Sequence, residues 1–148
     1  MALYVIGDLH LSFGSEKPMD VFGEAWCNHF DKIKEDWLNQ VTPSDTVIIP
    51  GDISWAMSFE DAFMDLSWID ALPGKKILFK GNHDYWWTSM AKMNGVFESI
   101  TFVHNGYGVY EDAALVGSRG WLCPNEVKFD DNDLKVYKRE IIRIENSI

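Results

Sequence analysis

Polar motifs follow three apolar runs of this chain, and together they contain the ligand types of a divalent metal site. They are GDLH at residues 7–10, GDIS at 51–54 and GNHD at 81–84. Carboxylate, imidazole and amide oxygens suit Mn²⁺, Fe²⁺ or Zn²⁺, and the motifs lack the thiolates of a structural zinc site. Taken alone, GDLH would equally suit a Gly-Asp turn with a surface histidine. The meaning of the motifs therefore depends on whether the fold brings them together.

The apolar runs before the motifs predict buried strands near residues 3–6, 46–50 and 76–80. Between the first two strands, aromatic and aliphatic side chains recur at spacings of three and four, which predicts an amphipathic helix over about 20–40. Its apolar stripe consists of Phe22, Trp26, Phe30, Ile33 and Trp37. A second helix is expected to begin after Ser58 as its N-cap. Its buried side is expected to contain Phe63, Leu66 and Ile69.

The pattern changes after the third motif. A short helix over about 84–93 is followed by the strand-like segments ITFVHNG, GVYE and AALVGS. A last helix is expected after Asp130 as its cap, with Leu134, Tyr137, Ile141 and Ile144 on one side. The order β-α-β-α-β followed by further strands predicts an α/β layered architecture with a mainly parallel first half. We expect one domain over residues 1–148.

Parallel strands joined by right-handed crossovers deliver their carboxyl ends to one edge of a sheet, where open α/β sheets bind ligands. The residues expected to meet there are Asp8, His10, Asp52, Asn82 and His83. Each motif begins with a glycine, which lets the backbone turn sharply out of the strand.

Composition excludes several other classes of protein. The formal net charge of −10 makes nucleic acid an unlikely partner, because nucleic-acid modules usually carry a basic face. Neither a G-x-G-x-x-G nor a G-x-x-x-x-G-K-[ST] nucleotide motif occurs. No stretch predicts a signal peptide or a membrane span. The two cysteines, Cys27 and Cys123, form no metal or redox motif, so we expect a reduced, cytoplasmic setting.

The series D-x-H, GD and GNHD resembles the calcineurin-like metallophosphoesterase family. The strings GDLHLSFG, PGDISWAM, LPGKKILFKGNHDYWW and GSRGWLC are similar to a bacterial branch of phosphohydrolases within it, and the match covers essentially the whole chain. The resemblance implies a layered α/β/β/α fold. It also implies hydrolysis of a phosphomonoester or phosphodiester at a site that holds up to two divalent ions, Mn²⁺, Fe²⁺ or Zn²⁺.

By the same resemblance, Asp8 and His10 bind the first metal ion, Asp52 bridges both ions and Asn82 binds the second. His83 would be the catalytic imidazole, which protonates the leaving oxygen or steadies the phosphate.

Two further residues are assigned supporting roles. By the resemblance, Asp84 would orient the His83 imidazole. Arg119, in the segment GSRGW, could contact the substrate phosphate as a bidentate donor, although an ordinary surface arginine is the alternative.

The sequence departs from the family pattern at its C-terminal side. Family members continue with a histidine-containing segment and a GHxH motif that supply three further ligands, whereas this sequence ends at Ile148 without them. We therefore expect a family fold that is incomplete on that side, a weak second metal site and feeble activity. The alternative is a non-catalytic domain that acts as an interaction or oligomerisation module. In both cases an uncovered sheet edge predicts a homo-oligomer or a partner chain.

Overall fold

A four-stranded parallel sheet forms the centre of the protein. The computed structural model describes residues 1–124 and 128–148. The strands are β1 (Leu3–Val5), β2 (Thr46–Ile49), β3 (Lys75–Phe79) and β4 (Ile100–Val103), and they lie in the order β1-β2-β3-β4. The expected adjacency of the first three strands is confirmed. The register places Val5 opposite Ile48, and Ile48 opposite Ile77.

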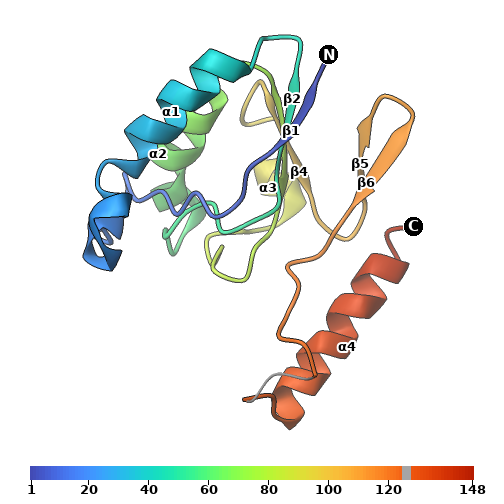
Figure 1. The fold of residues 1–148 in the computed structure, drawn as a ribbon. Helices are drawn as coiled ribbons and strands as arrows, with labels where there is room; N and C mark the ends of the chain where they lie inside the picture. The colour runs from blue at the N-terminus through green and yellow to red at the C-terminus, as the bar shows by residue number, and fades with distance from the viewer. Residues whose placement is uncertain (125–127) are drawn as a thin grey trace.

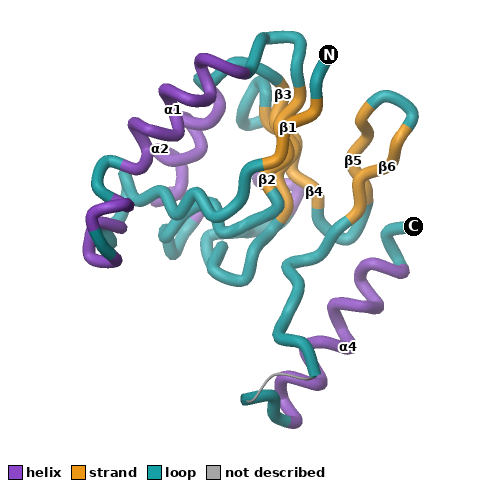
Figure 2. Tube along the Cα trace, in the orientation of Figure 1, coloured by secondary structure: helices purple, strands orange, loops and turns teal. Residues whose placement is uncertain are grey.

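Helices cover one face of this sheet, as Figures 1 and 2 show. They are α1 (His29–Gln40), α2 (Phe59–Asp70) and the short α3 (Met90–Met93). The main hydrophobic core lies between these helices and the sheet, where Trp37 of α1 and Leu66 of α2 pack with Leu78 of β3. Burial of this apolar surface is the principal force that holds the helices to the sheet.

A hairpin covers the opposite face. Its strands, β5 (Tyr107–Tyr110) and β6 (Ala113–Val116), pair in antiparallel fashion as a separate two-stranded sheet. Side chains alternate along a strand, so β3 directs Leu78 toward the helices and Ile77 and Phe79 toward the hairpin. Leu115 of β6 packs against this smaller cluster. The protein thus consists of a helical layer, the parallel sheet and the hairpin, which confirms the expected α/β class.

The last helix, α4 (Asp131–Glu145), lies apart from α1 and α2 (Figure 1). Asp130 caps it as expected, because its carboxylate accepts hydrogen bonds from the backbone nitrogens of Asn132 and Asp133. The Asp133 carboxylate accepts in return from the backbone nitrogen of Asp130, which completes a capping box. None of the helices in the described part of the chain combines the length and apolar character needed to cross a bilayer.

The predicted helix over residues 20–40 is wrong in its first half. Two turns of 3₁₀ helix, Met19–Phe22 and Glu24–Trp26, precede α1, which begins only at His29. Gly23 has φ 123° and Asn28 has φ 51°, and neither value fits a continuous right-handed helix. Phe22 is 66% exposed as a result.

The expected buried side of α2 was also partly wrong. Ser58 is its N-cap as expected, and Leu66 and Ile69 are fully buried, but Phe63 is 49% exposed. The buried stripe is completed by Ala62 and by an acidic residue, Asp65.

The short helix expected over 84–93 is reduced to α3, so most of this segment is irregular. The local reason is the carboxylate of Asp84, which accepts hydrogen bonds from surrounding N–H groups and holds the chain in a turn.

A buried lysine links β3 to the end of α2. The Lys76 ammonium donates hydrogen bonds to the carbonyl oxygens of Asp70 and Leu72 and to the Ser99 hydroxyl. Helix C-termini leave such carbonyls without intrahelical partners. The Asp70 carbonyl also accepts from the Ser99 hydroxyl, so Lys76 matters most for the carbonyl of Leu72. Burial lowers the pKa of Lys76 from 10.5 to about 8, and the charge of Asp70 opposes this shift.

We expect Lys76→Met to destabilise the protein by about 1–3 kcal/mol near neutral pH, because it removes the side-chain donor to the buried Leu72 carbonyl. The folded-state pKa of Lys76 lies below its ordinary value, so between pH 8 and 10.5 the unfolded chain binds more protons. Wild-type stability should therefore rise relative to Lys76→Met across this window. Urea unfolding of both proteins at several pH values measures the difference. A difference that stays flat or falls with pH would contradict this account.

Candidate metal centre

The loops that follow β1 and β2 share an unusual backbone conformation. Asp8, His10 and Asp52 all have positive φ, at 56°, 45° and 53°. Residues other than glycine seldom adopt this left-handed conformation, and it tends to persist where the surrounding structure enforces it at a functional site. Here it turns each loop sharply after its strand.

Backbone hydrogen bonds continue the parallel pairing beyond β1 and β2 and hold the two loops in register. The amides of Asp8, His10 and Leu11 donate to the carbonyls of Gly51, Asp52 and Ile53 at 3.2, 3.0 and 2.9 Å, respectively. The two loops therefore form one structural unit.

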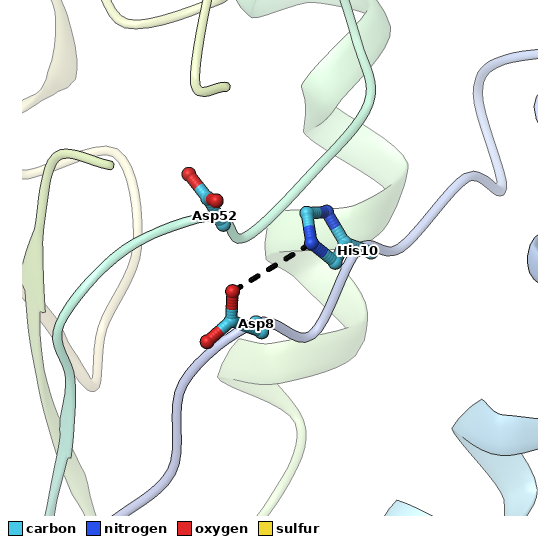
Figure 3. A group of neighbouring side chains, drawn as sticks. All are labelled: Asp8, His10 and Asp52. Atoms are coloured by element: carbon cyan, nitrogen blue, oxygen red, sulfur yellow. Dashed lines mark ion pairs between the residues drawn. The ribbon is translucent and has the colours of Figure 1, made fainter. Parts of the chain in front are cut away.

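This unit brings together two carboxylates and an imidazole (Figure 3). Asp8 and His10 from the first loop and Asp52 from the second each offer one ligand atom, and these atoms lie within 4.8 Å of one another. Nε2 of His10 is 3.7 Å from Oδ1 of Asp8. The side chain of Asp8 is 72% exposed, whereas that of His10 is 12% exposed, so the group opens to solvent on the Asp8 side.

The donor set fits a divalent cation. Two carboxylates and one imidazole suit Mn²⁺, Fe²⁺ or Zn²⁺, and Nδ1 of His10 is buried without a hydrogen-bond partner in the described part of the chain. Burial lowers the pKa of His10, and the charges of Asp52 and Asp8 act in the opposite direction. A lowered pKa favours the neutral imidazole, which is the form that binds a metal.

The third motif joins the same unit through Asp52. The backbone N–H of His83 donates to Oδ1 of Asp52 at 3.0 Å. The imidazole of His83 lies 6.0 Å from that of His10, measured between ring centroids. Asn82, between Gly81 and His83, is exposed and lines a cavity of about 470 Å³ together with Arg119, Trp121 and Leu122. The expected gathering of the motif residues at the carboxyl edge of the sheet is therefore what the structure shows.

Asp84 was expected to orient the His83 ring, but its carboxylate has other partners among the described residues. The fully buried Asp84 carboxylate accepts hydrogen bonds from the backbone amides of Gly81, Asp52, Ile53 and Ser54 and from Nε1 of Trp86, at 2.7–3.3 Å. Burial raises the pKa of Asp84, and these hydrogen bonds oppose the shift. Asp84 thus fixes the backbone of the second and third loops instead of the His83 ring.

Arg119 lies in the same cavity as Asn82 but is also engaged elsewhere. Its Nε is 3.2 Å from Oε1 of the buried Glu140, and its guanidinium lies 4.8 Å from the Trp121 ring centroid. Arg119 is thus held by side chains on both sides of its guanidinium, and its contact with a substrate phosphate stays a prediction.

Trp55, directly after the second motif, packs against two of the motif histidines. The indole stacks on the His10 imidazole, with centroids 4.7 Å apart and planes inclined by 16°, and it lies 5.0 Å from the His83 ring. Its Nε1 donates to the sulfur of Met19. Trp55 therefore restricts the orientation of His10.

Asp65 is a second supporting residue, and the sequence analysis did not identify it. It is fully buried on α2 and accepts hydrogen bonds from the backbone amide of Phe13, at 2.8 Å, and from the Ser54 hydroxyl. Burial raises the pKa of Asp65, and these hydrogen bonds oppose the shift. An acidic residue at the spacing of the buried stripe, between Ala62 and Leu66, was the signal that could have revealed it.

Comparison with known proteins identifies similar sequences and one similar fold. A family model described as calcineurin-like phosphoesterase matches residues 1–145. The crystal structure of a protein of unknown function from Aquifex aeolicus is similar, with 26% sequence identity and a TM-score of 0.57. The similarity covers 99% of this chain and 75% of that one. No curated protein matches the chain.

We expect Gly81→Ala to disrupt this centre, because a Cβ at Gly81 would overlap the backbone nitrogen and Oδ1 of Asp52. The overlap should cost about 1–3 kcal/mol of stability and displace Asp52. Gly106→Ala is the matched control, since a Cβ there meets no atom within 4 Å and should change stability by less than about 0.5 kcal/mol. Urea unfolding of both variants tests this, and equal effects would show that the close approach is not rigid.

Proposed function

The chain belongs to the calcineurin-like phosphoesterase family, and we propose that it is a metal-dependent hydrolase of phosphomonoesters or phosphodiesters. The observation that carries this proposal is the group formed by Asp8, His10 and Asp52, which lies at the carboxyl edge of the parallel sheet. The family match supports the reaction class, and the donor set supports a cation at the site.

Asp8, His10, Asp52 and Asn82 are the residues that would hold the metal ions. A bound divalent cation such as Mn²⁺, Fe²⁺ or Zn²⁺ would supply positive charge that polarises the phosphoryl group. Asp52 lies between the contributions of the other two loops, because its backbone pairs with the first loop and its carboxylate accepts from His83 of the third. Asp52 is therefore the residue that connects the three motifs.

His83 is the proposed proton donor to the leaving oxygen. Its backbone is anchored to Asp52, and its ring is half-buried beside Trp55, so its position is restricted before a substrate arrives. An imidazole suits this role because its ordinary pKa lies near neutral pH. Arg119, which lines a cavity together with Asn82, would contact phosphate oxygens of the substrate.

We expect Asp52→Asn to weaken Mn²⁺ binding by at least about tenfold relative to wild type, and to weaken it more than His10→Ala does. The amide offers one good oxygen and no negative charge, whereas His10→Ala removes only a neutral ligand. Asp52→Asn should also stabilise the metal-free protein, since two neighbouring carboxylates without a cation repel each other. Calorimetric titration with Mn²⁺ and thermal unfolding with and without the ion measure both effects. Asp112→Asn, at an exposed position in the β5–β6 turn, is the control.

The same proteins test the reaction. With 4-nitrophenyl phosphate and bis(4-nitrophenyl) phosphate, Mn²⁺-dependent release of nitrophenol should fall in His83→Asn by roughly 10²–10⁴-fold, which is the usual contribution of a general acid. Mn²⁺ affinity should change much less in His83→Asn than in Asp52→Asn. If wild type and Asp52→Asn show the same Mn²⁺-dependent shift in melting temperature, Asp52 binds no metal ion and the proposal fails.

A second candidate role, self-association, is favoured by the position of β1. Within the described residues β1 is the end strand of the sheet, and its Leu3 and Val5 side chains are 38% and 65% exposed. An end strand with unpaired backbone groups and apolar side chains invites pairing with a second copy of the chain. Self-association would be the role of the domain if the domain has no catalytic activity.

We expect the purified chain to form dimers that Val5→Lys weakens, because a charged residue on an end strand disfavours pairing between sheets. Light scattering across a range of concentrations measures the mass of both proteins. Lys138→Gln on α4 serves as a control for a change of charge away from this edge. A wild-type chain that stays monomeric throughout would remove this candidate.

A further inference from the structure

Three arginines surround one buried carboxylate next to the proposed metal centre. Glu140 of α4 is 3% exposed, and its Oε1 lies 2.8 Å from Nη1 of Arg143, 3.2 Å from Nε of Arg119 and 3.8 Å from Nε of Arg139. We call Arg119, Arg139 and Arg143 the arginine cluster. It joins α4 to the segment that follows β6.

Positive charge in this cluster exceeds what Glu140 can neutralise. All three guanidinium groups approach the same oxygen, while Oε2 of Glu140 is buried without a partner in the described part of the chain. Arg119 and Arg143 each direct a single nitrogen at Glu140, and their other guanidinium nitrogens have no hydrogen-bond partner among the described residues. An excess of positive charge in a protein of net charge −10 marks a place where the local field favours an anion.

Arg119 connects the cluster to the proposed active site. It lines a cavity of about 470 Å³ together with Asn82, and the other described residues that line this cavity are Trp121 and Leu122. Side chains of Arg119 and Arg143 are 21% and 29% exposed, so they are partly desolvated yet still accessible. A partly desolvated guanidinium binds an oxyanion more strongly than a fully solvated one, because the local dielectric is lower.

We propose that this cavity is an anion subsite that binds a second phosphoryl group of the substrate through Arg119, with Arg143 supplying further positive charge. The guanidinium fork matches the spacing of phosphoryl oxygens, and the larger charge and third acceptor oxygen of a phosphoryl group favour it over a carboxylate. Glu140 holds the arginines in place. The inferred substrate class is a phosphoester with two phosphoryl groups, one at the metal centre and one in the subsite. That role in catalysis rests on the proposed function, whereas anion binding in the cavity does not.

The subsite is tested by calorimetric titration of the metal-free chain, in EDTA, with pyrophosphate, orthophosphate and malonate. We expect pyrophosphate to bind, and its dissociation constant to rise on the order of tenfold in Arg119→Gln, in line with the loss of one charged hydrogen-bonding group. Arg143→Gln should weaken binding by a smaller factor. Lys138→Gln, which removes the same charge from an exposed position of α4, should leave the dissociation constant unchanged.

A folding defect is separated from a binding defect by Arg119→Lys, which keeps the charge and loses the fork. Its melting temperature should match wild type, and its pyrophosphate affinity should lie between those of wild type and Arg119→Gln. Equal pyrophosphate affinity in wild type and Arg119→Gln would overturn the subsite even if the chain hydrolyses nitrophenyl esters. Malonate binding as tight as pyrophosphate binding would overturn its preference for phosphoryl groups. Pyrophosphate binding with this pattern in a chain that hydrolyses nothing would leave the subsite standing and remove the proposed function.

Discussion

The arrangement of the candidate metal centre depends on the buried carboxylate of Asp84. Removing an ionised carboxylate from water costs several kcal/mol, and each hydrogen bond to a charged acceptor returns about 1.5–3 kcal/mol. The balance is favourable only when most of the surrounding N–H groups donate to it, and four backbone amides and the Trp86 indole do so. Because these donors come from the second and third loops, satisfying Asp84 also fixes where Asp52 and His83 lie.

Close approach of the two loops around Asp84 then restricts the residues beside it. At Gly51, whose φ is 146°, a Cβ would overlap the backbone of Gly81, and at Gly81 it would overlap Asp52. Glycine is therefore required by the contact between backbones and not only by the turn. Asp65 performs a similar task on the other side, since it binds the Phe13 amide of the first loop and the Ser54 hydroxyl of the second. Two buried carboxylates thus hold three loops together.

The sequence was sufficient to predict the strands, their parallel order and the meeting of Asp8, His10, Asp52 and His83, because the periodicity of buried strands and the handedness of crossovers leave few alternatives. The family resemblance assigned Asp84 to the His83 ring, whereas the donors to its carboxylate include amides about thirty residues earlier in the chain. The start of α1 was misplaced because the apolar spacing continues through Gly23. Contacts of this kind are decided by tertiary packing, which local patterns do not encode.

Charge is distributed unequally across the two halves of the site, and this inequality has a consequence for the order of binding. Asp8 and Asp52 carry negative charge where a phosphoryl group would react, so without a cation they repel it. Arg119 lines a cavity with Asn82 and Arg143 binds the same Glu140 oxygen as Arg119, so the positive charge on this side attracts it. An anion can therefore occupy the arginine side whether or not a cation is present, whereas the Asp8 side accepts an anion only after a cation has neutralised the carboxylates. The arginines would thus first bind one phosphoryl group of a substrate that has two. Its other phosphoryl group would enter the metal centre only when a cation is bound there.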